Sequence, residues 1–197
     1  MNPQIEKLIK MFAKLPRVGS RAAQRIVLAL LQDKTGRANA LSEMLSVTAN
    51  TIHPCKICGV LTDKDTCEFC SSTERANGQL CIVRDMSDVW VIEKSGFYSG
   101  RYHITSGVIS GTNGTMPDDL NIASIPSRIK QEKINEIIFA LPNTVEGKTT
   151  QSYIMSVVGE NSGVAFSELA SGMPLGGDLD YIDDGTLTLA FGGRKKL

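Results

Sequence analysis

The 197-residue sequence lacks the features that mark membrane, secreted and strongly charged proteins. It has no apolar run long enough to cross a membrane. No signal peptide is visible over residues 1–15, so we expect a cytoplasmic protein whose cysteines are not held in disulfides. It also has no net charge, because 21 Lys and Arg residues balance 21 Asp and Glu residues. The chain is long enough for one large domain or for smaller domains with a metal module.

Four cysteines lie close together, as Cys55-x-x-Cys58 and, eight residues later, Cys67-x-x-Cys70. Each pair places two sulfurs on one tight turn, and two pairs complete a tetrahedral four-sulfur shell that suits zinc. Such a shell leaves no position for water. The sequence therefore predicts one structural Zn²⁺ per chain, which folds the segment and performs no chemistry. His53 could serve as a ligand, but with four cysteines available we expect it beside the site.

Positive charge is concentrated at the N-terminal end. Residues 1–37 hold eight Lys and Arg residues against Glu6 and Asp33, whereas residues 77–197 hold ten basic and fourteen acidic residues. A basic end on a mildly acidic body indicates a polyanionic partner for that end. An ordinary solvated basic helix face would give the same imbalance, so charge alone leaves both interpretations open.

The basic end is predicted to form a helical hairpin. Apolar residues at helical spacing indicate a helix over 3–14, Pro16 and Gly19 end it, and Ser20 is expected to cap a second helix. This is the form of a helix-hairpin-helix motif, in which backbone N–H groups at the turn contact a DNA phosphate without reading bases. A third helix is predicted over 38–49. The candidate DNA contacts are the basic residues near the turn: Lys14, Arg17, Arg21 and Arg25.

Strands and helices alternate from residue 80 onward, which implies a mainly parallel sheet with helices on its faces. The apolar strands are predicted at 80–83, 102–105, 137–141 and 164–169, and the helices at 125–133, at 147–158 and after a cap at Ser87. Cys81 in the first strand is interpreted as a buried apolar residue and not as a fifth metal ligand. After a glycine-rich loop, residues 181–182 are expected to form an edge strand and 184–190 a short helix, a tail suited to packing on a neighbouring subunit.

Two phosphate-handling motifs are incomplete at the carboxyl ends of these strands. Gly147-Lys148-Thr149 is similar to the end of a P-loop, but Pro142 occupies the position of the first required glycine. A Toprim-type Mg²⁺ site needs a Glu after the first strand and an Asp-x-Asp after a later one, where this chain offers only Asp85 and Glu146. We therefore expect Asp85 and Glu146 to hydrogen-bond to loops and helix N-termini.

The order of these parts resembles the RecR family of bacterial recombination mediators over nearly the whole chain. The segments that carry the resemblance are Leu15-Pro16-x-Val18-Gly19, Ala23-Gln24-Arg25, the four cysteines, Gly100-Arg101-Tyr102-His103, Thr144-Val145-Glu146-Gly147 and Gly172-x-Pro174-x-Gly176-Gly177. The resemblance implies a multi-part α+β and α/β fold. Its parts would be a helix-hairpin-helix DNA-binding region (1–52), a four-Cys zinc finger (53–76), a Toprim-like mainly parallel α/β domain (77–175) and a strand-helix tail for subunit packing (176–197).

The resemblance also implies a function without catalysis. RecR proteins form ring-like tetramers that encircle or clamp DNA, and they work with RecO and in many bacteria with RecF. Together these proteins help to load RecA onto single-stranded DNA covered by single-strand-binding protein. The family's DNA-contacting basic residues correspond to Arg21 and Arg25, and the Toprim face around Asp85 and Glu146 would serve as a partner surface. Binding to single- and double-stranded DNA and association with the nucleoid are the corresponding expectations.

The chain departs from the family pattern at several positions. Arg17 stands where many hairpins of this kind have glycine, Asp85 replaces the usual Glu, Pro142-Asn143 reverses the usual Asn-Pro, and Ser171 replaces an Arg. Two alternative functions remain open from the residues. One is a Mg²⁺-dependent Toprim nuclease or strand-passing enzyme that uses Asp85 and Glu146. The other is a protein-interaction scaffold whose basic hairpin does not bind DNA.

Overall fold

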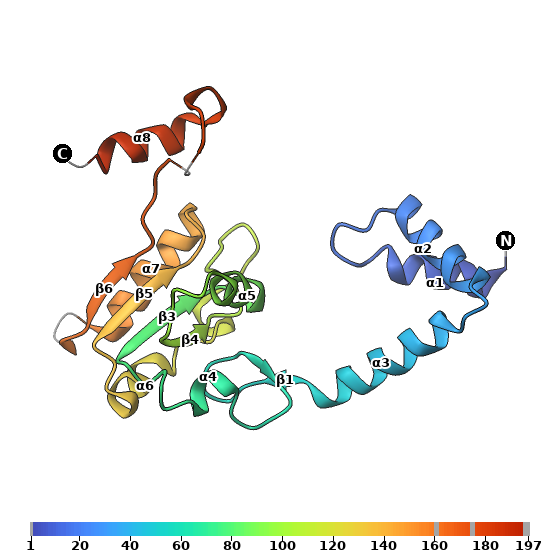
Figure 1. Cartoon of the computed structure of the whole chain (residues 1–197), viewed down its shortest axis with the longest axis horizontal. Helices are drawn as coiled ribbons and strands as arrows, with labels where there is room; N and C mark the ends of the chain where they lie inside the picture. The colour runs from blue at the N-terminus through green and yellow to red at the C-terminus, as the bar shows by residue number, and fades with distance from the viewer. Residues whose placement is uncertain (1, 160–161, 174–175, 195–197) are drawn as a thin grey trace. The chain divides into compact units, whose positions relative to one another are not determined.

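The computed structural model describes residues 2–159, 162–173 and 176–194 (Figure 1). Pro174 of the tail motif and the basic residues Lys195 and Lys196 lie outside the described residues. The chain divides into two compact units, Met1–His53 and Pro54–Leu197, which are described separately below. No helix among the described residues is long and apolar enough to span a membrane.

The first unit consists of helices α1 (Pro3–Phe12), α2 (Ser20–Gln32) and α3 (Arg37–Thr51). Asn2 caps α1 by accepting a hydrogen bond from the backbone N–H of Gln4 at 2.9 Å. The predicted helices are confirmed, but the predicted cap of α2 is wrong. Ser20 is the first helical residue, and the N-cap is Gly19, which has no side chain to satisfy the exposed N–H groups.

The hairpin has a small core. Ala23 and Val27 of α2 are fully buried, whereas Ile26 and Leu31, which lie at helical spacing with them, remain exposed. Only those two residues of the described part of the first unit are buried apolar side chains. The first unit is therefore held by few apolar contacts, and most of its surface is available to solvent or to a partner.

The second unit begins with a small metal module. Strand β1 (His53–Pro54) pairs with β2 (Leu61–Thr62), and the short helix α4 (Glu68–Ser71) follows. The module leads into β3 (Gln79–Val83), the first strand of the main sheet.

The main sheet has four strands in the order β4-β3-β5-β6, and all three neighbouring pairs are parallel. Its other strands are β4 (Arg101–Ile104), β5 (Glu136–Ala140) and β6 (Ala165–Glu168), and its helices are α5 (Met86–Ser95), α6 (Ile125–Glu132) and α7 (Val145–Val158). The predicted mainly parallel α/β body is confirmed. Figure 1 shows β3 and β5 in the middle of this sheet, so both of their faces need apolar cover.

Alternating residues of β3 serve two separate cores. Leu80 and Ile82 pack with apolar residues of α6 and α7, whereas Cys81 and Val83 pack with Val89 of α5 and with the metal module. Cys81 is 2% exposed, as expected for a buried apolar residue. The metal module is thus part of the cover of one sheet face.

The tail contains a 3₁₀ helix (Leu179–Tyr181) and helix α8 (Asp184–Gly192). The predicted edge strand at residues 181–182 is wrong, because the backbone turns at Leu179–Tyr181 instead of extending. The predicted short helix is confirmed. Asp183 caps α8 by accepting from the backbone N–H of Thr186 at 3.0 Å.

Candidate metal centre and DNA-binding hairpin

The four paired cysteines meet in one buried cluster. Their sulfur atoms all lie within 4.8 Å of one another. A zinc ion with Zn–S bonds of about 2.3 Å places its four sulfurs roughly 3.8 Å apart, which this cluster can meet with small adjustments. The cysteines are Cys55, Cys58, Cys67 and Cys70, between 0% and 7% exposed. The donor set fits one structural zinc ion.

The first cysteine pair sits on a turn that requires glycine. The backbone N–H of Gly59 donates to the carbonyl of Cys55 at 2.9 Å, and the N–H of Cys55 donates to Val60 at 2.7 Å. Gly59 has a φ of +80°, and a Cβ at this position would lie 3.3 Å from Ile104. The backbone N–H of Cys67 donates to the Cys55 sulfur at 3.4 Å, so the turns of the two pairs support each other.

The clustered thiols shift one another's pKa values in opposite directions. Hydrogen bonds from Cys58 and Cys70 lower the pKa of Cys67. The hydrogen bond with Cys67 raises the pKa of Cys58 instead, since a thiol beside a thiolate keeps its proton. Four thiolates repel one another at this separation, so a cation is needed before all four can ionise together.

The metal module is hydrogen-bonded to the edge strand β4 and packs against it. The backbone N–H of Ile104 donates to the carbonyl of Cys58 at 2.8 Å. Phe69 of α4 meets the ring of Tyr102 edge-on at 5.3 Å, and the guanidinium of Arg75 lies 4.9 Å from the Phe69 ring centre. The module therefore covers an exposed sheet edge as well as binding a metal.

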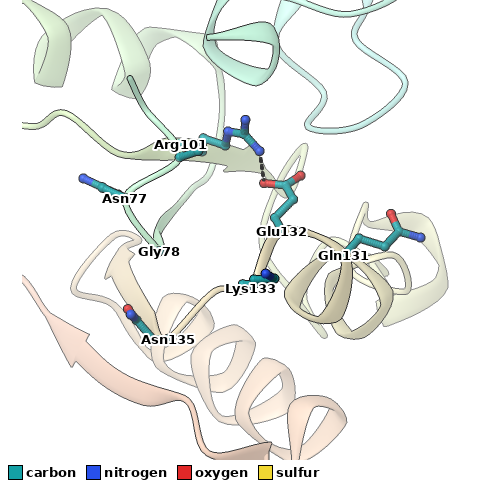
Figure 2. A pocket seen from close by; sticks show the side chains of 8 residues that line it. Asn77, Gly78, Arg101, Gln131, Glu132, Lys133 and Asn135 are labelled. Carbon is teal, nitrogen blue, oxygen red and sulfur yellow. Dashed lines mark ion pairs between the residues drawn. The ribbon is translucent and has the colours of Figure 1, made fainter. Parts of the chain in front are cut away.

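A buried ionic network lies between the module and the sheet, and no sequence pattern predicted it. Arg128 and Glu132 of α6 form an ion pair at 2.7 Å, and Arg101 of β4 joins Glu132 at 2.9 Å. Figure 2 shows the Arg101–Glu132 pair at the wall of a cavity of about 480 Å³. Burial opposes ionisation of Glu132, but hydrogen bonds from Arg128 and Arg101 prevail and lower its pKa. The i, i+4 spacing of Arg128 and Glu132 is typical of an ion pair on a helix surface, so the sequence did not indicate that this pair is buried.

The hairpin turn keeps a glycine-like conformation although it carries Arg17. The backbone N–H of Val18 donates to Leu15 at 3.1 Å, which closes the turn, and Arg17 has a φ of +63°. Its side chain is exposed. Arg17 therefore places a positive charge at the turn in a backbone conformation that glycine adopts freely.

Four exposed basic residues lie in the turn and on the helix next to the uncapped start of α2. Arg21 and Arg25 are exposed and one turn apart on this helix, and Lys14 and Arg17 are exposed before it. Among the described residues, none of these four forms an ion pair. The first-turn N–H groups and the unpaired cations together make a surface suited to phosphate.

The carboxylate of Asp85, at the carboxyl edge of the sheet, is bound to a helix start and to an arginine. Asp85, and not Ser87 as predicted, caps α5 by accepting from the Ser87 N–H at 2.8 Å. It also accepts from Arg84 at 2.9 Å, and the hydrogen bonds from Ser87 and Arg84 lower its pKa. The expectation that Asp85 binds a helix N-terminus is confirmed.

Glu146 lies in the first turn of α7, whose cap is Thr144. It lines a cavity of about 380 Å³ together with Arg84 and Pro142. A Cβ at Gly147 would clash with the Pro142 carbonyl oxygen, so the loop closes tightly onto the helix start. Pro142, which stands where a P-loop has its first glycine, therefore lies directly against the start of α7.

Four family models match successive parts of the chain. They describe a RecR helix-hairpin-helix over residues 5–48, a RecR zinc finger domain with four cysteines over 52–72, a Toprim domain over 78–170 and a RecR C-terminal segment over 172–195. Curated proteins match along the full length. The protein named "Recombination protein RecR" from Cereibacter sphaeroides is 42% identical over 192 residues, which cover 98% of this chain and 96% of that protein.

The chain belongs to the RecR family. Proteins of the same name from Paracoccus denitrificans and Maricaulis maris are each 42% identical over 98% of this chain, and they are covered to 97% and 95%. Family membership identifies the cysteine cluster as the RecR zinc finger, so the chain binds zinc through four cysteines. The hairpin is the RecR helix-hairpin-helix, and the parallel sheet is a Toprim domain. The chain therefore has a role in recombination.

Proposed function

We propose that the chain is a DNA-binding recombination mediator without catalytic activity. In this proposal it acts with RecO, and with RecF where present, to help load RecA onto single-stranded DNA. Its working parts are residues 1–52 for DNA, 53–76 for zinc, 77–175 for partners and 176–197 for subunit packing. It would bind single- and double-stranded DNA as a ring-like tetramer, in the cytoplasm and on the nucleoid.

The observation that carries this proposal is the exposed start of α2. Gly19 leaves the first N–H groups of the helix without a side-chain partner, and Arg21 and Arg25 stand beside them without an ion pair among the described residues. This arrangement fits one phosphate group, which every nucleotide carries, and phosphate contacts fix position without reading sequence. Binding should therefore be independent of sequence and sensitive to salt.

The test replaces Arg21 and Arg25 together with alanine. Each lost phosphate contact on a single strand reduces the slope of log K against log salt by roughly 0.7, so the double variant should lose about 1.4 of the slope and more than tenfold in affinity. Fluorescence anisotropy with labelled oligonucleotides of unrelated sequence at several salt concentrations measures both quantities. The matched control is Lys64→Ala with Lys130→Ala, two exposed lysines of the second unit. Salt-independent binding, or equal loss in the control, would contradict the proposal.

The alternative of a Mg²⁺-dependent nuclease is less well supported. The carboxylate of Asp85 is occupied by Arg84 and by the start of α5, so a metal would have to displace both. A cleavage assay with Mg²⁺ or Mn²⁺ on single- and double-stranded DNA decides the question. Cleavage that is lost in Glu146→Gln would make the enzyme the better interpretation.

Oligomeric state and RecO binding are tested separately from DNA binding. Molar mass from light scattering should correspond to four chains, with or without DNA. Asp85 and Glu146 are assigned to the RecO-binding face, so Glu146→Lys should weaken RecO binding in calorimetry and leave DNA affinity unchanged. A tetramer that gives no gel shift with any DNA would favour the scaffold function instead.

A further inference from the structure

Arg128 is a buried cation whose donors are directed to three different parts of the second unit. Its side chain is 3% exposed. The Nε atom donates to Glu132 Oε1 at 2.7 Å, and Nη1 donates to the Tyr102 carbonyl at 2.6 Å and to His103 Nδ1 at 3.2 Å. The Nη2 atom lies 3.6 Å from the sulfur of Cys70. A guanidinium has a rigid fork, so these partners fix its position and direct one N–H at a zinc ligand.

The ligand sulfurs receive different donors. The backbone N–H of Cys67 donates to the sulfur of Cys55 at 3.4 Å, whereas the sulfur of Cys70 is reached by the Arg128 side chain. Arg128 therefore does for Cys70 what the backbone does for Cys55. A backbone donor survives every substitution except proline, but the donor to Cys70 depends on this one side chain.

Charge explains why a cation is suited to this position. Four thiolates around Zn²⁺ carry a net charge of about −2, and a buried site of that charge is costly without a nearby cation. Glu132 neutralises part of the Arg128 charge but is itself shared with Arg101, whose Nη2 donates to the Ser72 carbonyl at 3.2 Å. Two guanidinium groups and one carboxylate therefore lie beside the zinc module, which leaves an excess of one positive charge there.

We propose that Arg128 is an outer-shell donor of the zinc centre. Glu132 orients its guanidinium, and the guanidinium protects the Cys70 thiolate as the backbone N–H of Cys67 protects that of Cys55. Arg128 is a positioning residue, because it acts on the metal through the sulfur of Cys70. A hydrogen bond to a metal-bound thiolate withdraws charge from sulfur, so it lowers the reactivity of that sulfur toward electrophiles.

The experiment compares cysteine reactivity in the zinc-loaded full-length chain. Wild type and Arg128→Met are treated with iodoacetamide, and mass spectrometry follows the alkylation of each cysteine. Loss of a charged hydrogen bond should raise the Cys70 rate about tenfold relative to Cys55, which keeps its backbone donor. Lys130→Met on the exposed face of the same helix is the control and should leave the ratio unchanged.

A second measurement separates this effect from loss of packing. In the Co²⁺-substituted protein, loss of the donor should shift the sulfur-to-cobalt charge-transfer band to lower energy. Arg128→Lys keeps the charge but cannot reach Glu132, Tyr102 and Cys70 together. Its charge-transfer band and its Cys70 alkylation rate should therefore lie between those of wild type and Arg128→Met. This variant replaces Arg128→Met in the experiment if the Met variant does not fold. An unchanged Cys70-to-Cys55 ratio and an unchanged band in a folded variant would overturn the proposal.

Discussion

The two units use their charged residues in opposite ways. In the hairpin, Lys14, Arg17, Arg21 and Arg25 are exposed and form no ion pair among the described residues. In the second unit, Arg128 is 3% exposed and Arg101 is 14% exposed, and both are bound to Glu132. Free surface cations attract a polyanion, whereas buried paired ions fix the position of neighbouring elements. The comparison favours nucleic-acid binding by the first unit and rigid geometry in the second.

Zinc removal should give the largest difference between the two units, because it should unfold part of the second unit and leave the first unit unchanged. A structural zinc site contributes on the order of 10 kcal/mol to folding in isolated fingers, so Cys58→Ser or a strong chelator should unfold residues 54–72. Phe69 would then leave Tyr102, and β4 would lose its cover. Hydrogen exchange should show lost protection there and unchanged protection in α1 and α2, with one zinc ion released per chain. Retained protection at 54–72 in metal-free protein would contradict this.

Acid should affect the second unit through His103. Burial lowers the pKa of His103 to about 4 from an ordinary value of 6.5. Its Nε2–H donates to the Asn121 carbonyl at 2.6 Å, and its Nδ1 faces the cationic Arg128, so the ring stays neutral in the folded state. Between these two pKa values the unfolded chain binds a proton that the folded chain does not. The contribution of His103 to the free energy of unfolding is therefore fully present above pH 6.5 and is lost as the pH decreases toward 4.

The shift of the His103 pKa corresponds to roughly 3 kcal/mol across that range. Urea unfolding at a series of pH values measures it. His103→Gln keeps a donor but cannot take up the proton, so its stability should depend less steeply on pH between 6.5 and 4. An equal slope in wild type and variant would assign the acid sensitivity to other groups.

The cysteine spacing, the alternation of strands and helices, and the Pro/Gly turn were sufficient to predict the zinc site, the parallel sheet and the hairpin. Each depends on local chemistry or on a short period that the sequence displays directly. The caps of α2 and α5 were assigned wrongly because both helices begin earlier than expected. Ser20 is the first residue of α2 after the cap at Gly19, and Ser87 is the second residue of α5 after the cap at Asp85.

The buried ionic network could not be predicted from the sequence. Arg101, Arg128 and Glu132 come from two elements, and only the packing of α6 against β4 and the zinc module brings them together. Charged residues in a sequence are by default assigned to the surface. Their burial depends on tertiary contacts that no local pattern records.

A substitution in the closed loop before α7 should have a smaller effect on the stability of the second unit. A Cβ at Gly147 would clash with the Pro142 carbonyl, so Gly147→Ala should force the loop apart and cost about 1–3 kcal/mol. Thermal unfolding measures the loss. DNA affinity should stay unchanged, because the loop belongs to the second unit. Ser156→Ala on the exposed face of α7 is a control and should have little effect.

The smallest expected effect lies at the turn of the hairpin, where charge and backbone strain can be separated. Arg17 adopts a φ of +63°, which costs an L-residue about 1 kcal/mol and a glycine almost nothing. Arg17→Gly should therefore unfold at higher urea concentration than Arg17→Ala, as measured on the first unit by hydrogen exchange. Both variants lose the same charge, so both should weaken DNA binding by the same few-fold factor. If Arg17→Gly instead binds DNA as tightly as wild type, the side chain makes no phosphate contact, and DNA binding depends on Arg21, Arg25 and the backbone of α2.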